Sequence, residues 1–135
     1  MMKLLVTGGL GFIGSNFILN VLKNTNFEIL NIDAEFYGSN HYNLIEVENS
    51  PKYSFVKGDI TDKKLMENLI SKCDCVVNFA AESHVDRSIL DPSPFLNSNI
   101  FGTFTILDII KNQKKRLVHV STDEVYGTIL EGSAT

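Results

Sequence analysis

Two neighbouring carboxylic acids, Asp123 and Glu124, follow an apolar segment of the 135-residue chain. A carboxyl pair can divide acid and base work, because one group can donate a proton while the other, ionised, accepts one. Such a pair can equally be two solvated side chains after a strand. The position of the pair in the fold therefore decides whether it does chemistry.

A glycine-rich run, Gly-Gly-Leu-Gly-Phe-Ile-Gly at residues 8–14, directly follows an apolar stretch that ends at Thr7. Its glycines fit both the G-x-G-x-x-G and the G-x-x-G-x-x-G spacing. Either spacing lets a pyrophosphate approach the backbone while a helix N-terminus supplies free N–H donors. An ordinary strand-to-helix turn is the alternative. The residues predicted to contact a dinucleotide here are Gly8, Gly11, Phe12, Ile13 and Gly14.

An acidic residue, Asp33, follows Gly14 by 19 residues and ends the next apolar stretch. This is the distance at which an acidic group accepts hydrogen bonds from the adenosine ribose. A capping aspartate is the alternative. A carboxylate here would repel a 2′-phosphate, so the sequence predicts NAD in preference to NADP.

The third apolar stretch ends in Lys-Gly-Asp-Ile at residues 57–60. Asp59 could meet the adenine amino group and Ile60 could cover the ring, although Asp59 could also only cap a turn. Asp62 is expected to be the N-cap of the following helix.

The elements that would position these residues alternate between strand and helix. Short apolar runs predict strands over Lys3–Thr7, Phe27–Ile32, Tyr53–Lys57, Asp74–Phe79 and Arg116–Ser121. Helical spacing predicts helices over Phe12–Lys23, Asp62–Lys72 and Pro92–Asn112, with a short one around Tyr42–Val47. The alternation predicts an α/β fold, a Rossmann-like doubly wound parallel sheet with strand order 3-2-1-4-5. Such sheets bind ligands at the carboxyl ends of their strands, which favours a functional role for Asp123 and Glu124.

Composition narrows the class of partner. A net charge of -4 with dispersed lysines argues against nucleic acid and anionic membranes, and favours a small-molecule partner. No run of 18 apolar residues and no signal peptide are expected, which places the chain in the cytoplasm. Cys73 and Cys75 should point to the same face of a strand, as free thiols, with neither a disulfide nor a metal site.

Three segments carry a resemblance to a known family. Residues 78–89 (Asn-Phe-Ala-Ala-Glu-Ser-His-Val-Asp-Arg-Ser-Ile), 97–103 (Asn-Ser-Asn-Ile-Phe-Gly-Thr) and 119–127 (His-Val-Ser-Thr-Asp-Glu-Val-Tyr-Gly) closely resemble the dTDP-glucose 4,6-dehydratases of the extended short-chain dehydrogenase/reductase family. The resemblance covers essentially the whole chain. It implies that NAD takes a hydride from the sugar C4, that water leaves across C5 and C6, and that the hydride returns to C6. Oxidation at C4 makes the C5 proton acidic, while the C6 hydroxyl leaves only when protonated.

The resemblance also assigns roles to residues. Glu124 would be the base at C5, Asp123 the acid at O6, and Thr122 a hydrogen-bond partner of the sugar. The segment after the fourth strand would place Ala80, Ala81 and Ser83 beside the nicotinamide, and Glu82 and His84 beside the sugar. His84 is expected to position the substrate and not to act as an acid. Asn99 would lie near the cofactor or satisfy backbone groups, and Arg87 would contact substrate or pair with Asp86.

Alternatives remain open. Sugar-nucleotide epimerases lack the carboxylate pair, which favours dehydration, but part of an epimerase or a non-catalytic dinucleotide-binding module is also possible. Whether the nucleotide is dTDP or UDP is undecided.

The family's Tyr-x-x-x-Lys pair has a decoy here, Tyr53 and Lys57, which a strand would separate by roughly 13 Å and not the roughly 6 Å of a helix turn. The true pair, the last strands and the nucleotide-sugar domain are expected beyond residue 135. Residues 1–135 would then be an incomplete NAD-binding domain that binds NAD without turnover. It is expected to form a homo-oligomer, or to associate through apolar surface that the missing part would cover.

Overall fold

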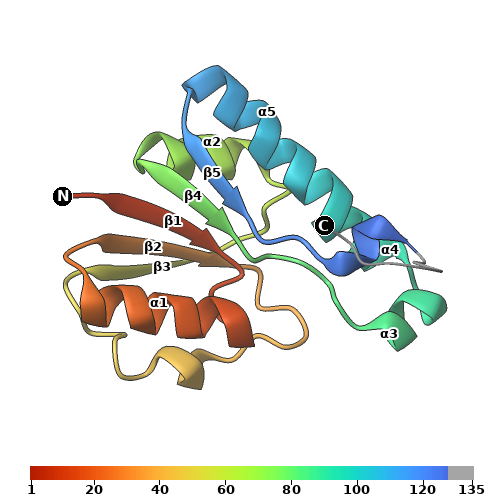
Figure 1. The fold of residues 1–135 in the computed structure, drawn as a ribbon, viewed down its shortest axis with the longest axis horizontal. Helices are drawn as coiled ribbons and strands as arrows, with labels where there is room; N and C mark the ends of the chain where they lie inside the picture. Colours follow the sequence, from red (N-terminus) through yellow and green to blue (C-terminus); the bar gives the residue numbers. More distant parts are fainter. Residues whose placement is uncertain (128–135) are drawn as a thin grey trace.

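A parallel sheet of five strands organises the chain. The structure, a computed structural model, describes residues 1–127, and for Val85 and Glu124 it describes the backbone alone. The strands are β1 (Lys3–Thr7), β2 (Glu28–Asp33), β3 (Tyr53–Lys57), β4 (Cys75–Asn78) and β5 (Arg116–His119). They are arranged in the order β3-β2-β1-β4-β5, which confirms the predicted order. Because all four pairings are parallel, the carboxyl ends share one edge (Figure 1).

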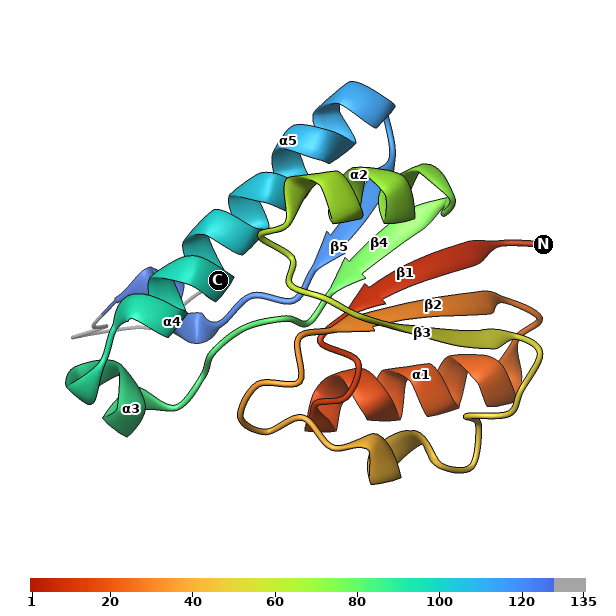
Figure 2. The ribbon, with the colours of Figure 1, turned by 180° about the vertical axis from the view of Figure 1, so that it is seen from behind.

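Helices cover both faces of this sheet. The helical elements of the described residues are α1 (Phe12–Asn24), α2 (Lys63–Ser71), α3 (Val85–Leu90), α4 (Ser93–Phe95) and α5 (Thr103–Gln113), with a π-helical segment η2 (Leu96–Gly102) and 3₁₀ turns η1 (His41–Leu44) and η3 (Asp123–Tyr126). Helix α1 lies on one face, and α2 and α5 lie side by side on the other (Figures 1 and 2). The fold is the predicted doubly wound one.

The core has two layers, one on each face of the sheet. One layer joins the strands to α2 and α5 and includes Leu5, Leu30, Ile32, Val76, Met66, Ile70, Ile106 and Ile109. The other joins them to α1 and η1 and includes Leu4, Val6, Ile29, Val77, Ile18 and Leu44. Neighbouring residues of one strand thus serve opposite layers, as expected for strands buried on both faces.

The prediction that both cysteines face the same way was wrong. Cys73 precedes β4 in the turn after α2 and is buried in the α2–α5 layer, whereas Cys75 begins the strand and packs on the α1 layer. Both thiols are free. Burial raises the pKa of the Cys73 thiol to about 11. That thiol is therefore a poor nucleophile at neutral pH.

The predicted long helix over 92–112 is interrupted. Residues Leu96–Gly102 wind as a π-helix between α4 and α5. A β-carbon at Gly102 would come within 2.4 Å of the Ile60 side chain, so a glycine is required there. The N-cap prediction for α2 is confirmed, because the Asp62 carboxylate accepts a hydrogen bond from the Leu65 amide at 3.0 Å. The sequence analysis missed α3.

Candidate active site

The glycine loop after β1 is packed against its own chain at three of its four glycines. Gly8 has a left-handed φ of 68°, and a β-carbon there would lie 2.7 Å from the Ala80 backbone. A β-carbon at Gly9 would lie 2.2 Å from the Asn31 side-chain oxygen, and one at Gly14 would lie 2.4 Å from the Gly8 carbonyl oxygen. Close packing within the chain explains these three glycines.

Gly11 is different. A β-carbon there would meet only the Gly8 carbonyl oxygen, at 3.3 Å, and its φ of -71° suits any residue. The first hydrogen bond of α1 runs from the Ser15 amide to Gly11. Among the described residues, no acceptor is bonded to the amides of Phe12, Ile13 and Gly14. Gly11 therefore leaves open the approach to an unsatisfied helix N-terminus, where an anion would be stabilised.

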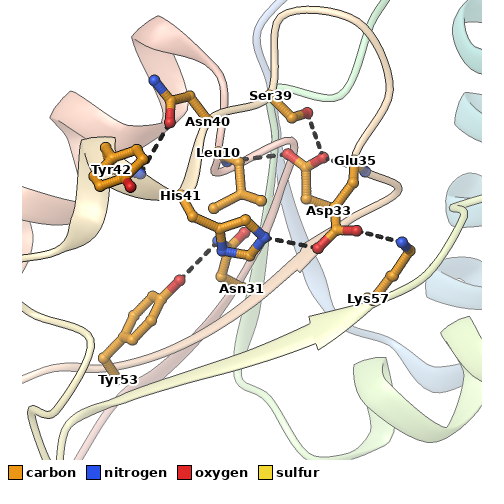
Figure 3. Close-up of polar contacts among 10 residues, drawn as sticks. All are labelled: Leu10, Asn31, Asp33, Glu35, Ser39, Asn40, His41, Tyr42, Tyr53 and Lys57. Atoms are coloured by element: carbon orange, nitrogen blue, oxygen red, sulfur yellow. Dashed lines mark hydrogen bonds and ion pairs between the residues drawn. The ribbon is translucent and has the colours of Figure 1, made fainter.

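Asp33, at the carboxyl end of β2, is buried and faces the same loop. Its Oδ2 accepts from the Leu10 amide at 3.0 Å, and its Oδ1 accepts from the Glu35 amide at 2.9 Å and the Ser39 hydroxyl at 2.7 Å (Figure 3). A carboxylate offers about four acceptor positions, so one remains on Oδ2. Asp33 thus holds the glycine loop in place and can still accept one ligand hydroxyl. Both acceptor positions of Oδ1 are used by Glu35 and Ser39.

Asp59 and Ile60, which follow β3, make contacts within the chain. The Asp59 Oδ1 accepts hydrogen bonds from the amide and hydroxyl of Thr61, both at 2.8 Å, which is the turn-capping alternative. Ile60 is buried in the α2–α5 layer. Contact of either residue with an adenine stays a prediction.

A buried polar chain joins the carboxyl ends of β1, β4 and β5. The Thr7 hydroxyl donates to the Asn78 side-chain oxygen, and the Asn78 amide nitrogen lies 2.9 Å from His119 Nδ1. The Ala80 amide also donates to the Thr7 hydroxyl, at 3.4 Å. Thr7 and Asn78 are almost fully buried. The segments that follow β4 and β5 are thereby aligned with the strand that precedes the glycine loop.

The segment after β4 is held by Asn99 of η2. The Glu82 amide donates to the Asn99 side-chain oxygen, and the Asn99 amide donates back to the Glu82 carbonyl, each at 2.9 Å. Asn99 therefore satisfies backbone groups, which is one of its two predicted roles. Its contact with a cofactor stays a prediction.

A cluster of side chains connects the loop after β2 to the segment after β4. The Arg87 guanidinium lies 4.4 Å from the centre of the Tyr37 ring, whose edge meets the His84 ring at a centroid distance of 5.0 Å. Arg87 Nη1 also lies 4.0 Å from Glu82 Oε2. The ion partner of Arg87 is therefore Glu82, and the alternative of an Arg87–Asp86 pair was wrong. The Ser83 and His84 side chains are exposed, as is Ala81, whereas Ala80 is half-buried.

The carboxylate pair follows β5 as predicted. Thr122 and Asp123 are exposed, and the Thr122 hydroxyl lies 3.3 Å from Asp123 Oδ1. Asp123 begins the turn η3, which also contains the backbone of Glu124. The Glu124 side chain lies outside what the structure describes. The backbone thus places both residues at the carboxyl edge of the sheet, beyond β5.

Tyr53 and Lys57 are opposite ends of β3 and have separate partners. The Tyr53 hydroxyl accepts from the Asn31 amide at 3.0 Å, and Lys57 pairs with Glu35. Burial raises the pKa of Tyr53, which is the wrong direction for a tyrosine base. The prediction that this pair is a decoy is consistent with both observations.

Sequence reasoning missed the positioning roles of Thr7, His119, Tyr37 and Ser39. Thr7 could have been found, because a polar residue at the buried end of an apolar strand needs a partner. The other three act through contacts that form only in the folded chain, and no local spacing of residue types indicates such contacts.

No helix within residues 1–127 is long and apolar enough to cross a membrane.

The fold is doubly wound, the N-terminus of its first helix is open, and a buried acid ends its second strand. These features are typical of dinucleotide-binding proteins. Within that class, residues 5–135 match the model of the GDP-mannose 4,6 dehydratase family, and the chain belongs to that family.

Individual relatives show which members of the family this chain resembles. The chain is 46% identical to the low-salt glycan biosynthesis protein Agl12 of Haloferax volcanii, covering 99% of this chain and 44% of that protein. It is 45% identical to a dTDP-glucose 4,6-dehydratase of Actinoplanes sp., covering 98% of this chain and 43% of the relative. The chain therefore spans less than half the length of these relatives.

Solved structures agree with this likeness. The dTDP-glucose 4,6-dehydratase DesIV of Streptomyces venezuelae, with NAD and TYD bound, superposes with a TM-score of 0.92 at 45% identity, over 98% of this chain and 43% of that one. A UDP-glucose 4-epimerase of Stenotrophomonas maltophila, also with bound NAD, superposes with a TM-score of 0.83 at 28% identity, over 97% and 40%. The dehydratase is the nearer of these two.

Proposed function

We propose that this chain is the cofactor-binding part of an NAD-dependent dTDP-glucose 4,6-dehydratase, a lyase of nucleotide-sugar biosynthesis. The observation that carries the proposal is the combination of an open helix N-terminus at Gly11 with a free acceptor position on Asp33. Gly11 keeps open the unbonded amides of α1, and Asp33 retains one acceptor position beside them. A dinucleotide needs both an anion site and a ribose acceptor, at this spacing.

The residues present fit NAD. The amides of Phe12, Ile13 and Gly14 would face the pyrophosphate, and Asp33 would accept a ribose hydroxyl. Ala80, Ala81 and Ser83 would line the nicotinamide side, because the Ala80 backbone already lies against the Gly8 turn. Bound NAD supplies the hydride acceptor at C4 of the sugar and the donor at C6.

The carboxylates after β5 would handle the protons. Glu124 would remove the C5 proton and Asp123 would protonate the leaving C6 hydroxyl, with Thr122 bonding the sugar. The 3.3 Å contact between Thr122 and Asp123 supports their joint placement at one end of β5. Glu82 and His84 would contact the sugar from the segment after β4.

A sugar-nucleotide 4-epimerase is the second candidate, favoured by the likeness to epimerase structures. The carboxylate pair Asp123 and Glu124 favours dehydration. Analysis of the product distinguishes the two, because an epimerase retains the C6 hydroxyl.

Apolar side chains are exposed along η2 and α5, which supports self-association or a partner polypeptide. They are Leu96, Ile100, Phe101, Phe104 and Leu107. Sedimentation velocity distinguishes a monomer from a self-associated chain. The free thiols Cys73 and Cys75 agree with the cytoplasmic location that we propose.

The proposal is tested by calorimetric titration of the chain with NAD. Gly11→Val should weaken binding roughly tenfold or more, because the side chain would stand between the pyrophosphate and the helix amides. Gly11→Ala should have an intermediate effect. Unchanged affinity in a folded Gly11→Val variant would contradict the phosphate site.

Activity is tested with NAD and dTDP-glucose by assaying the 4-keto-6-deoxy product. Within this sequence, Tyr-x-x-x-Lys occurs only in β3, so we expect the chain alone to bind NAD without turnover. Turnover near that of a dehydratase relative, abolished by Glu124→Gln, would contradict this and show that another group replaces the tyrosine.

A further inference from the structure

Glu35 lies two residues after Asp33 and adopts an unusual backbone conformation. Its φ is 59°, in the left-handed region that a residue with a side chain rarely adopts. Its amide donates to Asp33 Oδ1 at 2.9 Å. This bond fixes Glu35 directly beside the proposed ribose acceptor.

The Glu35 carboxylate bridges two basic side chains from different elements. Its Oε1 lies 2.7 Å from His41 Nε2 of η1, and its Oε2 pairs with Lys57 Nζ at the end of β3 (Figure 3). The hydrogen bond from Lys57, followed by that from His41, holds the pKa of Glu35 below its ordinary value. Glu35 is therefore ionised at neutral pH, and its carboxylate forms an ion pair with Lys57.

Lys57 is a cation at the strand end beside the proposed ribose acceptor. It is paired with Asp33 in the register of β2 and β3, so it lies at the strand end next to the ribose acceptor. A lysine ammonium is a point charge well suited to a phosphate. The ion pair with Glu35 neutralises this charge, so the paired lysine would not attract a 2′-phosphate.

We propose that Glu35 is a specificity-determining residue, which excludes NADP by holding Lys57 away from a 2′-phosphate. This inference rests on the proposed dinucleotide function. The proposal gives the two acids, Asp33 and Glu35, different roles. Asp33 binds the ribose and the glycine loop, whereas Glu35 sets the charge balance around the 2′ position.

The test is calorimetric titration of four proteins with NAD and NADP at low salt: the unaltered chain, Glu35→Gln, Lys57→Met and Glu35→Gln/Lys57→Met. In Glu35→Gln the freed lysine should strengthen NADP binding about tenfold, while NAD affinity changes less than about threefold. Adding Lys57→Met should abolish that gain. Lys57→Met alone should leave the preference for NAD unchanged. Glu67→Gln on α2 is the matched control, since it removes the same charge from an exposed surface elsewhere.

The outcomes separate this inference from the proposed function. If Glu35→Gln binds NAD but gains nothing for NADP, or if the gain survives Lys57→Met, the role of Glu35 is wrong and the dinucleotide site stands. If the folded, unaltered chain binds neither nucleotide, the proposed function itself fails. An NADP gain equal to that of Glu67→Gln would reduce the effect to net charge and also overturn the inference.

Discussion

The carboxyl edge of the sheet has two halves that differ in how completely the chain encloses them. We name the halves after the roles proposed for them: the adenosine half comprises the ends of β1, β2 and β3 with the glycine loop, and the catalytic half comprises the ends of β4 and β5 with the segments that follow. Strand β1 is buried along almost its whole length, whereas β5 is largely exposed. Asp33 is 7% exposed and makes three hydrogen bonds, but Thr122 and Asp123 face solvent.

The difference indicates which function each half can support within these residues. Binding an anion and a ribose needs oriented amides and one acceptor, and the adenosine half holds these by contacts within the chain. Acid and base chemistry gains from exclusion of water, which strengthens electrostatic interactions at the reacting atoms. Nothing among the described residues excludes water from Asp123. Cofactor binding and catalysis should therefore respond differently to mutation.

The largest expected effect is at Gly8, where the two halves meet. Gly8→Ala combines a left-handed φ with overlap against the Ala80 backbone, so it should lower the free energy of unfolding by about 3 kcal/mol. Urea denaturation followed by circular dichroism measures this change. Gly38→Ala is the matched control, because Gly38 also has a positive φ but has nothing near a β-carbon. A loss of only about 1 kcal/mol, for backbone strain alone, is expected there. Equal losses in both variants would show that the contact between Gly8 and Ala80 is unimportant.

The next effect should come from the polar chain that links the halves. Thr7→Val removes the donor to Asn78 and leaves a buried amide oxygen without a partner, which should cost about 2 kcal/mol. Thr105→Val is the control, since the Thr105 hydroxyl donates to the Phe101 carbonyl one turn earlier and does not bridge distant segments. Hydrogen exchange of residues 79–82 should accelerate in Thr7→Val and remain unchanged in the control. Unaltered exchange and stability would mean that the halves are aligned without this chain.

The smallest effect is expected at Tyr37, which joins the loop after β2 to α3. Tyr37→Leu removes the cation–π contact with Arg87, which is worth about 0.5–1 kcal/mol at an exposed site. Exchange of residues 82–88 should increase while global stability changes little. Tyr42→Leu, at an equally exposed tyrosine, should change neither. If Tyr37→Leu leaves the exchange of residues 82–88 as it is, this contact does not restrain the segment after β4.

The sequence predicted the adenosine half better than the catalytic half, for a physical reason. Strand bounds Lys3–Thr7 and Tyr53–Lys57 agree with the structure, and Asp33 lies beside the glycine loop as its spacing predicts. Glycine spacing, alternating burial and N-caps are local properties, and so they can be recognised without a structure.

Contacts across the fold could not be predicted in this way. Cys73 faces the opposite layer from Cys75 because it belongs to the turn before β4, where the alternation of a strand's two faces does not apply. The close approach of Gly102 to Ile60 joins two segments 42 residues apart in sequence. The pairing of Glu35 with Lys57 joins the loop after β2 to the end of β3, 22 residues further along the chain.

The central claim is that the adenosine half alone binds the dinucleotide. Calorimetric titration of the chain with NAD, ADP-ribose and nicotinamide mononucleotide tests it most directly. ADP-ribose should bind within about threefold of NAD, because both carry the adenosine and the pyrophosphate, whereas nicotinamide mononucleotide should bind at least about a hundredfold more weakly. Binding of nicotinamide mononucleotide as tightly as NAD, or failure of the folded chain to bind ADP-ribose, would contradict the claim.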